Sequence, residues 1–151
     1  MHSATIRGME NNEQAVVRVV DKLFQVFQEL NAKAYGELFW PDGEFTNVFG
    51  MVAVGPEMIE SFHSPLFADP RTEGMPSFVH CELKKLDIRV RMLRSDIGLA
   101  DVRWCMTGAI APNGQPWGER LGLINMVVTR DGDRWKIAAL HNMDLPVSAS
   151  R

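Results

Sequence analysis

The sequence has few of the residues and motifs by which common classes of protein are identified. Its two cysteines, Cys81 and Cys105, are too few for a disulfide scaffold and too far apart for a zinc knuckle. The histidines show no HxH or HExxH spacing, so we expect no bound metal. A GxSxG elbow, a P-loop and a GxGxxG motif are also missing, and no cofactor is predicted.

The sequence also has no large excess of one charge sign and no long apolar run. The 19 acidic and 16 basic residues are interspersed and give a net charge of −3, so nucleic acid is not an expected partner. The apolar runs are shorter than a membrane span requires. The N-terminal MHSATIRGMENNE lacks the apolar core and the cleavage site of a secretory signal. With two cysteines that we expect to be reduced, these features predict a cytoplasmic protein.

The rest of the composition is ordinary for a globular chain. The 151 residues are 46% hydrophobic, which is enough to bury a substantial core in one domain. We therefore expect a single domain over residues 1–151, with an ordered core at about residues 12–145. The first dozen residues and the tail from Pro146 are predicted to be mobile.

The N-terminal half predicts helices around one short strand. Apolar residues recur at helical spacing over residues 15–30, with polar residues on the opposite side, which is typical of an amphipathic helix. Asn31 can cap a short second helix that Pro41 ends. Residues 44–48 alternate as a strand, and a third helix with proline in its first turn is expected over residues 55–62.

The C-terminal half has the periodicity of strands. Four segments are rich in Val, Ile, Leu and Trp, and turn residues separate them, so antiparallel hairpins are expected. They cover residues 79–92, 97–110, 120–130 and 134–143. Helices followed by such a meander predict an α+β fold, in which a curved antiparallel sheet forms a cone wrapped by about three N-terminal helices. A pocket is expected at the mouth of the cone.

Two polar residues of the N-terminal half are candidates for ligand binding. Asn47 lies between Phe45 and Phe49 at i±2, so the three side chains share one face of the predicted strand. A polar group between buried aromatics needs a partner, either a ligand or a neighbouring backbone group. His63 ends the predicted third helix, where it would contact a ligand or complement the helix dipole.

The predicted sheet carries the other candidates. His80 and His141 lie at ends of the first and last long strands, where a histidine serves as an acid or base or simply faces solvent. These two are the candidate catalytic residues. The others would bind ligand: Trp104 and Phe45 as apolar walls, Asn142 as a polar contact, and Arg120 and Met126 from one apolar strand face. An arginine on that face needs an anionic or polar partner unless it lies in solvent.

The order of the elements and three segments resemble the nuclear transport factor 2-like superfamily, and within it the SnoaL-like proteins of the SgcJ/EcaC group. The segments are FTNVFG, GPEMIESFH and RDGDRWKIAALHN, and the resemblance covers roughly residues 12–145. It implies a cone-shaped α+β barrel, a small-molecule pocket in the cone, and a homodimer formed through the sheet.

Two enzyme types of this superfamily provide a comparison. The base of ketosteroid isomerases falls on Asn47, whose amide cannot remove a proton. Limonene epoxide hydrolases match at Asn47 and Arg120, but their two aspartates fall on Gly122 and Asn142, which leaves neither a general acid nor a general base. The resemblance therefore does not extend to either catalytic machinery.

Three functions follow from these residues. The leading hypothesis is a domain that binds a hydrophobic or aromatic, polyketide-like metabolite, with weak acid–base activity from a histidine. A biosynthetic lyase, isomerase or hydrolase is the second, and a non-catalytic dimerisation module is the third. The sequence leaves open whether the chain is an enzyme.

Overall fold

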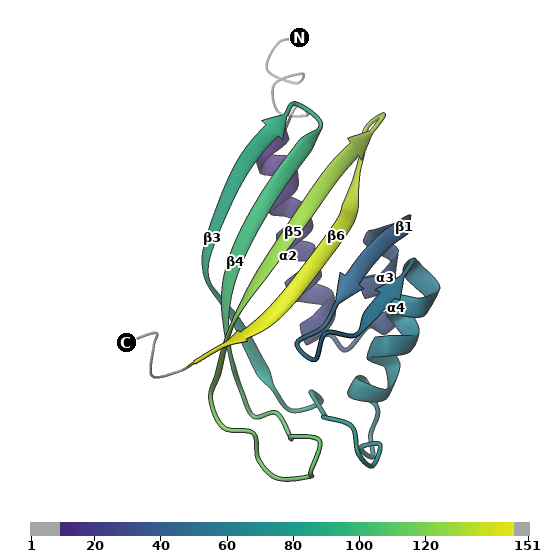
Figure 1. The fold of residues 1–151 in the computed structure, drawn as a ribbon, viewed down its shortest axis with the longest axis vertical. Helices are drawn as coiled ribbons and strands as arrows, with labels where there is room; N and C mark the ends of the chain where they lie inside the picture. Colours follow the sequence, from purple (N-terminus) through teal and green to yellow (C-terminus); the bar gives the residue numbers. More distant parts are fainter. Residues whose placement is uncertain (1–9, 147–151) are drawn as a thin grey trace.

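A computed structural model describes residues 10–146 of the chain (Figure 1). Its elements follow in the order α2 (Asn12–Gln28), α3 (Ala32–Glu37), β1 (Phe39–Thr46), β2 (Val52–Val54), α4 (Pro56–His63), the 3₁₀ helix η1 (Ser64–Phe67), β3 (Glu82–Arg94), β4 (Ile97–Thr107), β5 (Arg120–Asp131) and β6 (Arg134–Leu145). The predictions for the N-terminal stretch and for the tail beyond Pro146 fall mostly outside the described residues.

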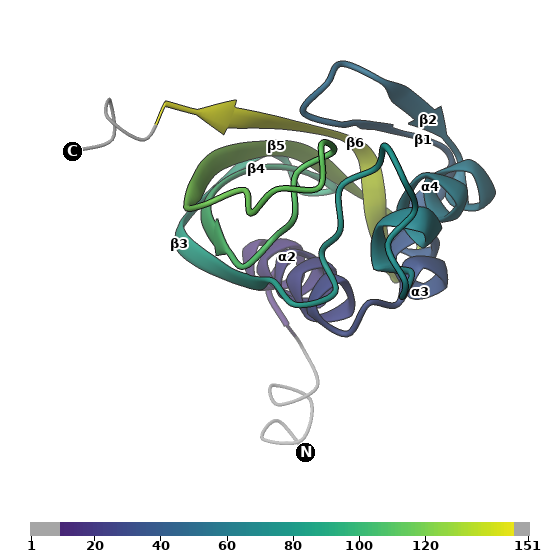
Figure 2. The same ribbon diagram turned by 90° about the horizontal axis from the view of Figure 1, so that it is seen from below.

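One six-stranded sheet runs through this part of the chain in the order β2-β1-β6-β5-β4-β3. Strands β3 to β6 form an antiparallel meander, whereas β1 lies parallel to β6. Seen from below, the meander curves around α2, and α3 and α4 lie beside this helix (Figure 2). The predicted α+β fold with a curved sheet is confirmed.

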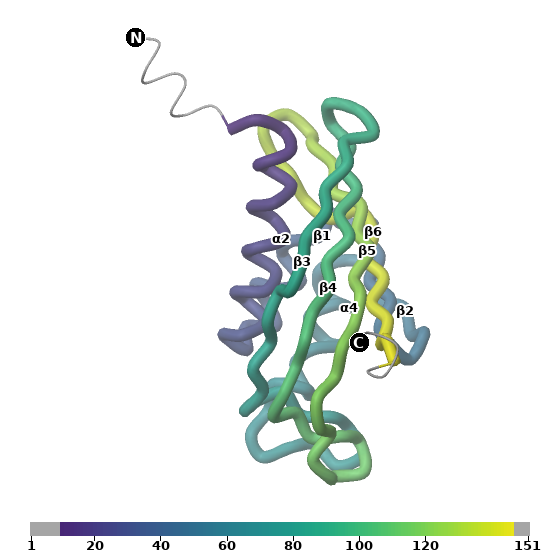
Figure 3. Tube along the Cα trace, turned by 90° about the vertical axis from the view of Figure 1, so that its left-hand side faces the viewer, coloured from purple at the N-terminus to yellow at the C-terminus, as the bar shows by residue number. Residues whose placement is uncertain are grey.

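Helix α2 covers the concave side of the sheet because one of its faces is apolar. It runs alongside β3 (Figure 3), and a glycine on β4 allows it to approach closely. A Cβ atom at Gly98 would come within 2.6 Å of Val16 Cγ2. The buried residues of the helix recur at the helical period: Ala15, Val16, Val19, Val20, Leu23, Phe24, Val26 and Phe27.

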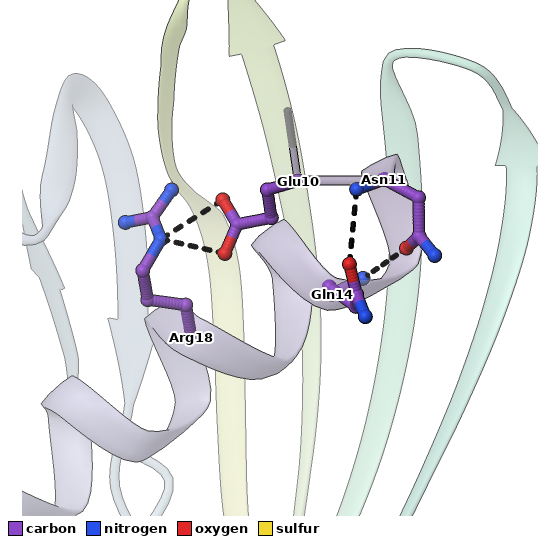
Figure 4. A network of polar contacts seen from close by, with 4 residues as sticks. All are labelled: Glu10, Asn11, Gln14 and Arg18. Carbon is purple, nitrogen blue, oxygen red and sulfur yellow. Dashed lines mark hydrogen bonds and ion pairs between the residues drawn. The ribbon is translucent and has the colours of Figure 1, made fainter. Parts of the chain in front are cut away.

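A capping box begins α2 (Figure 4). Asn11 Oδ1 accepts a hydrogen bond of 2.7 Å from the backbone N–H of Gln14, whose Oε1 accepts one of 3.1 Å from the backbone N–H of Asn11. Two N–H groups that the helix leaves without partners are satisfied in this way. Nearby, Arg18 Nε lies 3.1 Å from both carboxylate oxygens of Glu10.

Several predicted boundaries differ from the structure. The first strand begins at Phe39 rather than at residue 44, because the segment pairs with β6, with an irregular register between Phe39 and Glu44. Strand β3 begins at Glu82 rather than at residue 79, because residues 79–80 form a turn. Strand β4 ends at Thr107, since Gly108 has a φ of 85°. The short strand β2 was not expected.

Two connecting segments cross the lower end of the molecule. Residues 68–81 and 108–119 lie against each other there (Figures 1 and 2), joined by a bridge between Ser77 and Ile110. They close the end of the concave side that the helices leave uncovered. Among the described helices, none has the length and apolar character needed to span a bilayer.

Candidate ligand-binding cavity

A cavity of about 430 Å³ lies on the concave side of the sheet. Its wall combines α2, α3, α4, the inner face of the strands and the two connecting segments. Most of the wall is apolar or aromatic: Leu23, Phe24, Phe27, Phe45, Val48, Phe49, Met51, Phe62, Pro65, Leu66, Met75, Pro76, Phe78, Leu83, Trp104, Met106, Pro112, Trp117 and Ile124. Pockets of this size and lining take drug-sized molecules.

His63 is the histidine that reaches this cavity. It is 3% exposed, and its ring lies 4.1 Å from that of Tyr35 and 4.7 Å from that of Phe45, centroid to centroid. Nδ1 donates a 2.8 Å hydrogen bond to the carbonyl oxygen of Ile59, because a carbonyl oxygen only accepts. The proton is therefore on Nδ1, and Nε2 carries a lone pair.

Burial keeps this imidazole uncharged. Desolvation lowers the pKa of His63 from its usual 6.5 to about 4, and the bond to the Ile59 carbonyl opposes part of that shift. At neutral pH the side chain is a hydrogen-bond acceptor and not a cation. A neutral imidazole does not complement the helix dipole in the way that an imidazolium would.

Tyr35, which was not among the predicted site residues, also lines the cavity. It is 4% exposed, and burial raises the pKa of its phenol, so the hydroxyl stays protonated. Among residues 10–146, Arg120 Nε is the one buried side-chain nitrogen or oxygen with neither a partner nor accessible surface. Tyr35 Oη and His63 Nε2 have no hydrogen-bond partner in that range, so both retain accessible surface toward the cavity.

Asn47 lines the cavity, but its side-chain oxygen is hydrogen-bonded within its own turn. Oδ1 accepts hydrogen bonds from the backbone N–H groups of Phe49 (3.0 Å) and Met51 (2.9 Å). The backbone alternative considered for this residue therefore holds for the oxygen. The Nδ2 group has no partner within the described residues.

Trp104 and Asn142 form one unit of the wall. Trp104 Nε1 donates a 2.8 Å hydrogen bond to Asn142 Oδ1, and both residues line the cavity. Gly122 on β5 faces Trp104, and a Cβ atom there would overlap ring atoms Cε2 and Cζ2. The indole ring thus occupies the place that a side chain at 122 would need.

Arg120 is buried at one end of the cavity with its charge matched. Its Nη2 donates a 2.8 Å hydrogen bond to Asp144 Oδ1, and the guanidinium carbon lies 3.8 Å from the ring centroid of Trp117 and 5.3 Å from that of Trp104. Nη1 lies 3.7 Å from Met106 Sδ. Asp144 is the anionic partner that an arginine on this face was predicted to need.

No aspartate or glutamate is among the residues that line the cavity. Asp42, Glu44 and Glu119 are exposed, and Asp101 is half-buried on the convex face, where it accepts a 2.6 Å hydrogen bond from Arg89. That bond holds the pKa of Asp101 below its usual range, against a smaller opposing effect of burial. The polar groups of the lining residues are therefore amides, one imidazole, one phenol, the Ser61 hydroxyl and two indole N–H groups, with the Arg120 guanidinium neutralised by Asp144.

Three predicted site residues lie elsewhere. His80 is exposed in the turn before β3, away from the strand end at which it was expected. His141 is exposed on β6, on the face opposite to Asn142, because neighbouring strand residues point to opposite sides. Met126 is buried in the core at 1% exposure and is not among the lining residues. The other predicted residues, Phe45, Asn47, His63, Trp104, Arg120 and Asn142, all line the cavity.

Comparison of the sequence with protein families shows to which family the chain belongs. The profile of the SnoaL-like domain matches residues 11–141. The chain belongs to the SnoaL-like domain family. No protein of curated function matches the sequence.

Solved structures share the fold of this SnoaL-like domain. An uncharacterised protein with a cystatin-like fold from Caulobacter vibrioides is 20% identical over 90% of this chain and 91% of its own, with a TM-score of 0.78. An NTF2-like protein from Novosphingobium aromaticivorans is 20% identical over 98% and 90%, with a TM-score of 0.68. A ketosteroid isomerase-like protein from Erwinia carotovora atroseptica is 12% identical over 91% and 99%, with a TM-score of 0.69. These likenesses place the domain in the NTF2-like, cystatin-like fold.

Proposed function

We propose that this SnoaL-like domain binds a hydrophobic or aromatic, polyketide-like metabolite inside the cavity. The observation that carries the proposal is a concave space of about 430 Å³ with aromatic walls and few polar groups. Burial of apolar ligand surface against such walls is the main favourable contribution. The polar groups would fix the orientation of the ligand.

Binding is favoured over catalysis by the character of His63. Proton abstraction works best when the pKa of the base lies near the operating pH, whereas that of His63 is lowered to about 4. No carboxylate lines the cavity to act in its place. A biosynthetic lyase, isomerase or hydrolase is the alternative function, with His63 rather than His80 or His141 as its acid–base group.

Calorimetric titration with 2-acetylnaphthalene tests the proposal. A bulky residue in the wall should abolish binding, so we expect no heat and no rise in Tm for Leu66→Trp, whose wild-type residue lines the cavity. The matched control Leu86→Trp changes a side chain that is 57% exposed and should bind like the wild type. Equal binding by both variants, or no binding by the wild type, would contradict a ligand cavity. Chromatography with mass spectrometry of the recovered probe separates the alternatives, since an enzyme converts the probe into a product of different retention time or mass, whereas binding leaves it unchanged.

A homodimer through the sheet is the second part of the proposal. The convex face carries half-buried apolar side chains that no described helix covers, in particular Leu99, Leu121, Leu123 and Val127. Leu123 lies beside Met143 in the register, which is 49% exposed. An apolar face of this kind supports self-association.

The subgroup within the family, the cytoplasmic location and the extent of the domain are also proposals. The segments FTNVFG and RDGDRWKIAALHN support the SgcJ/EcaC group within the family. The thiols of Cys81 and Cys105 are unpaired, and burial raises the pKa of Cys81 to about 11, which supports inert thiols in a reducing cytoplasm. A single domain over the whole chain fits the family match to residues 11–141.

A further inference from the structure

Two side-chain amides of the cavity wall use their oxygen as a hydrogen-bond acceptor within the protein, while their N–H groups have no partner in the described residues. The oxygen of Asn142 is held by Trp104 Nε1, which can only donate, and the oxygen of Asn47 is held by two backbone N–H groups. The positions of oxygen and nitrogen in each amide follow from these partners. In both residues Nδ2 is therefore a free donor, and the Asn142 oxygen keeps one further lone pair.

The sheet places these two amides side by side. Strands β1 and β6 run parallel, and their last aligned residues are Thr46 and His141. Asn47 follows the last residue of β1 and Asn142 lies one step further along β6, next to Phe45 and Leu140 at i−2. Both residues line the cavity, so both amides border the same space. A single oxygen with two lone pairs satisfies such a pair.

The helical side of the cavity offers an acceptor, the imidazole of His63, beside the hydroxyl group of Tyr35. His63 Nε2 is an acceptor with no donor in the described residues, and α4 fixes it through the 2.8 Å bond to Ile59. The Tyr35 ring packs 4.1 Å from it, centroid to centroid. A ligand hydroxyl that donates to Nε2 would satisfy a buried nitrogen that otherwise loses its hydrogen bond to water.

The charge of the lining sets the charge of the ligand. Arg120 is the one cationic residue of the lining, and Asp144 is bonded to it. Its Nε has no accessible surface and its Nη1 lies against Met106 Sδ, so a ligand anion would have to compete with Asp144 for the guanidinium. Moving an anion from water into such a site is costly without a new counter-charge.

From these contacts we infer that the ligand is a neutral hydroxyaryl carbonyl compound. Its carbonyl oxygen accepts hydrogen bonds from Asn47 Nδ2 and Asn142 Nδ2, and its hydroxyl group donates to His63 Nε2. The aromatic body fills the space between Phe45, Trp104 and Phe78. This inference rests on the proposed function, because it names the ligand class of the same cavity.

Four naphthalene probes test the inference by calorimetry at pH 8. They are 6-hydroxy-2-acetylnaphthalene, its methyl ether, 2-acetylnaphthalene without the hydroxyl group, and 6-hydroxy-2-naphthoate. The hydroxyketone should bind about tenfold or more tightly than each of the other three, since each lacks one of the hydrogen bonds or carries a charge. If the ether or the naphthoate binds as tightly as the hydroxyketone, the inference is wrong while the proposed function stands. If no probe binds, both fail.

Variants then locate the two ends of the ligand. Asn47→Asp and Asn142→Asp keep an oxygen for the backbone and indole donors but remove the free N–H groups, so each should weaken binding of the hydroxyketone about tenfold or more. The matched control Asn11→Asp keeps the cap of α2, far from the cavity, and should leave affinity unchanged. His63→Phe should bind the hydroxyketone and its methyl ether equally. Retention of the wild-type preference in His63→Phe, or full affinity in both aspartate variants, would overturn the inference.

Discussion

The contact between Gly122 and Trp104 shows how one residue determines the chemistry of the cavity wall. The two positions face each other on neighbouring strands, and the indole ring lies where a Cβ of residue 122 would be. The same ring holds the amide of Asn142 in a fixed orientation. A carboxylate side chain at position 122 would therefore not fit while Trp104 keeps its present position.

The substitution Gly122→Ala should destabilise the domain because its methyl group displaces the indole ring. Overpacking in a core costs about 1–3 kcal/mol, and the Trp104–Asn142 hydrogen bond would be lost in addition. Urea unfolding measures the difference. The double variant Gly122→Ala/Trp104→Phe should recover part of the loss, since the smaller ring leaves room for the methyl group. An unchanged midpoint for the single variant would contradict this packing.

A second residue-scale prediction concerns His63 and pH. Its pKa is about 4 in the folded chain and about 6.5 when unfolded, so between these values the unfolded chain binds the extra proton. Stability should fall as the pH is lowered from 6.5 to about 4, by on the order of 3 kcal/mol in total, and this contribution levels off below that window. Among its ring neighbours Tyr35, Phe45 and Phe67, only Tyr35 titrates, and burial keeps it uncharged.

Unfolding at a series of pH values checks this effect. His63→Phe should lose most of the acid-side slope, and His141→Gln, which changes an exposed residue, should keep it. The same slope in wild type and His63→Phe would mean that another group causes the acid sensitivity.

At the scale of elements, the capping box of α2 should matter more than the ion pair beside it. Asn11→Ala removes an oxygen that satisfies a backbone N–H, which costs about 1 kcal/mol at such positions. Glu10→Gln breaks a contact with Arg18, whose side chain is 57% exposed, and exposed pairs contribute about 0–1 kcal/mol. Urea unfolding should rank the two losses in this order, and the reverse order would refute the assignment.

The elements that the sequence predicted well are those with a repeating pattern. Residues 15–30 were expected as a helix and α2 covers Asn12–Gln28, because one apolar face recurs along its length. The start of β1 at Phe39 depends on its parallel partner β6, which local sequence does not indicate. Phe78 and Cys81 are buried in a connecting segment, so their apolar character resembled that of a strand.

The site was predictable where strand alternation or helix position places a residue inward, as for Asn47 and Asn142. His141 shows the limit of that reasoning, since a single step along a strand reverses the direction of the side chain. Tyr35 was missed because the six-residue helix α3 is too short for its periodicity to indicate the buried face. Its role follows from tertiary packing against His63.

For the whole molecule, the arrangement of the convex face bears on assembly. Rows of side chains run across the strands: Leu99, Val127 and Ala139 form one row, and Arg103, Leu123 and Met143 belong to another. Between them lies a polar row in which Asp101 binds Arg89 and Asn125, with His141 next to Asn125. Apolar side chains on both sides of a hydrogen-bonded polar row are compatible with the proposed homodimer interface.

A charge in place of Leu123 should therefore dissociate the proposed homodimer. Leu123→Lys puts an ammonium group beside Met143, where burial at an interface without a partner is costly. Sedimentation velocity should show a dimer for the wild type and a monomer for this variant. The control Met58→Lys alters a 48% exposed residue of α4 on the other side of the sheet and should remain dimeric. Because position 123 faces away from the cavity, the monomer should still bind 2-acetylnaphthalene. A monomeric wild type would refute the dimer and leave the cavity proposal intact, whereas loss of binding with dissociation would show that the cavity depends on the second copy.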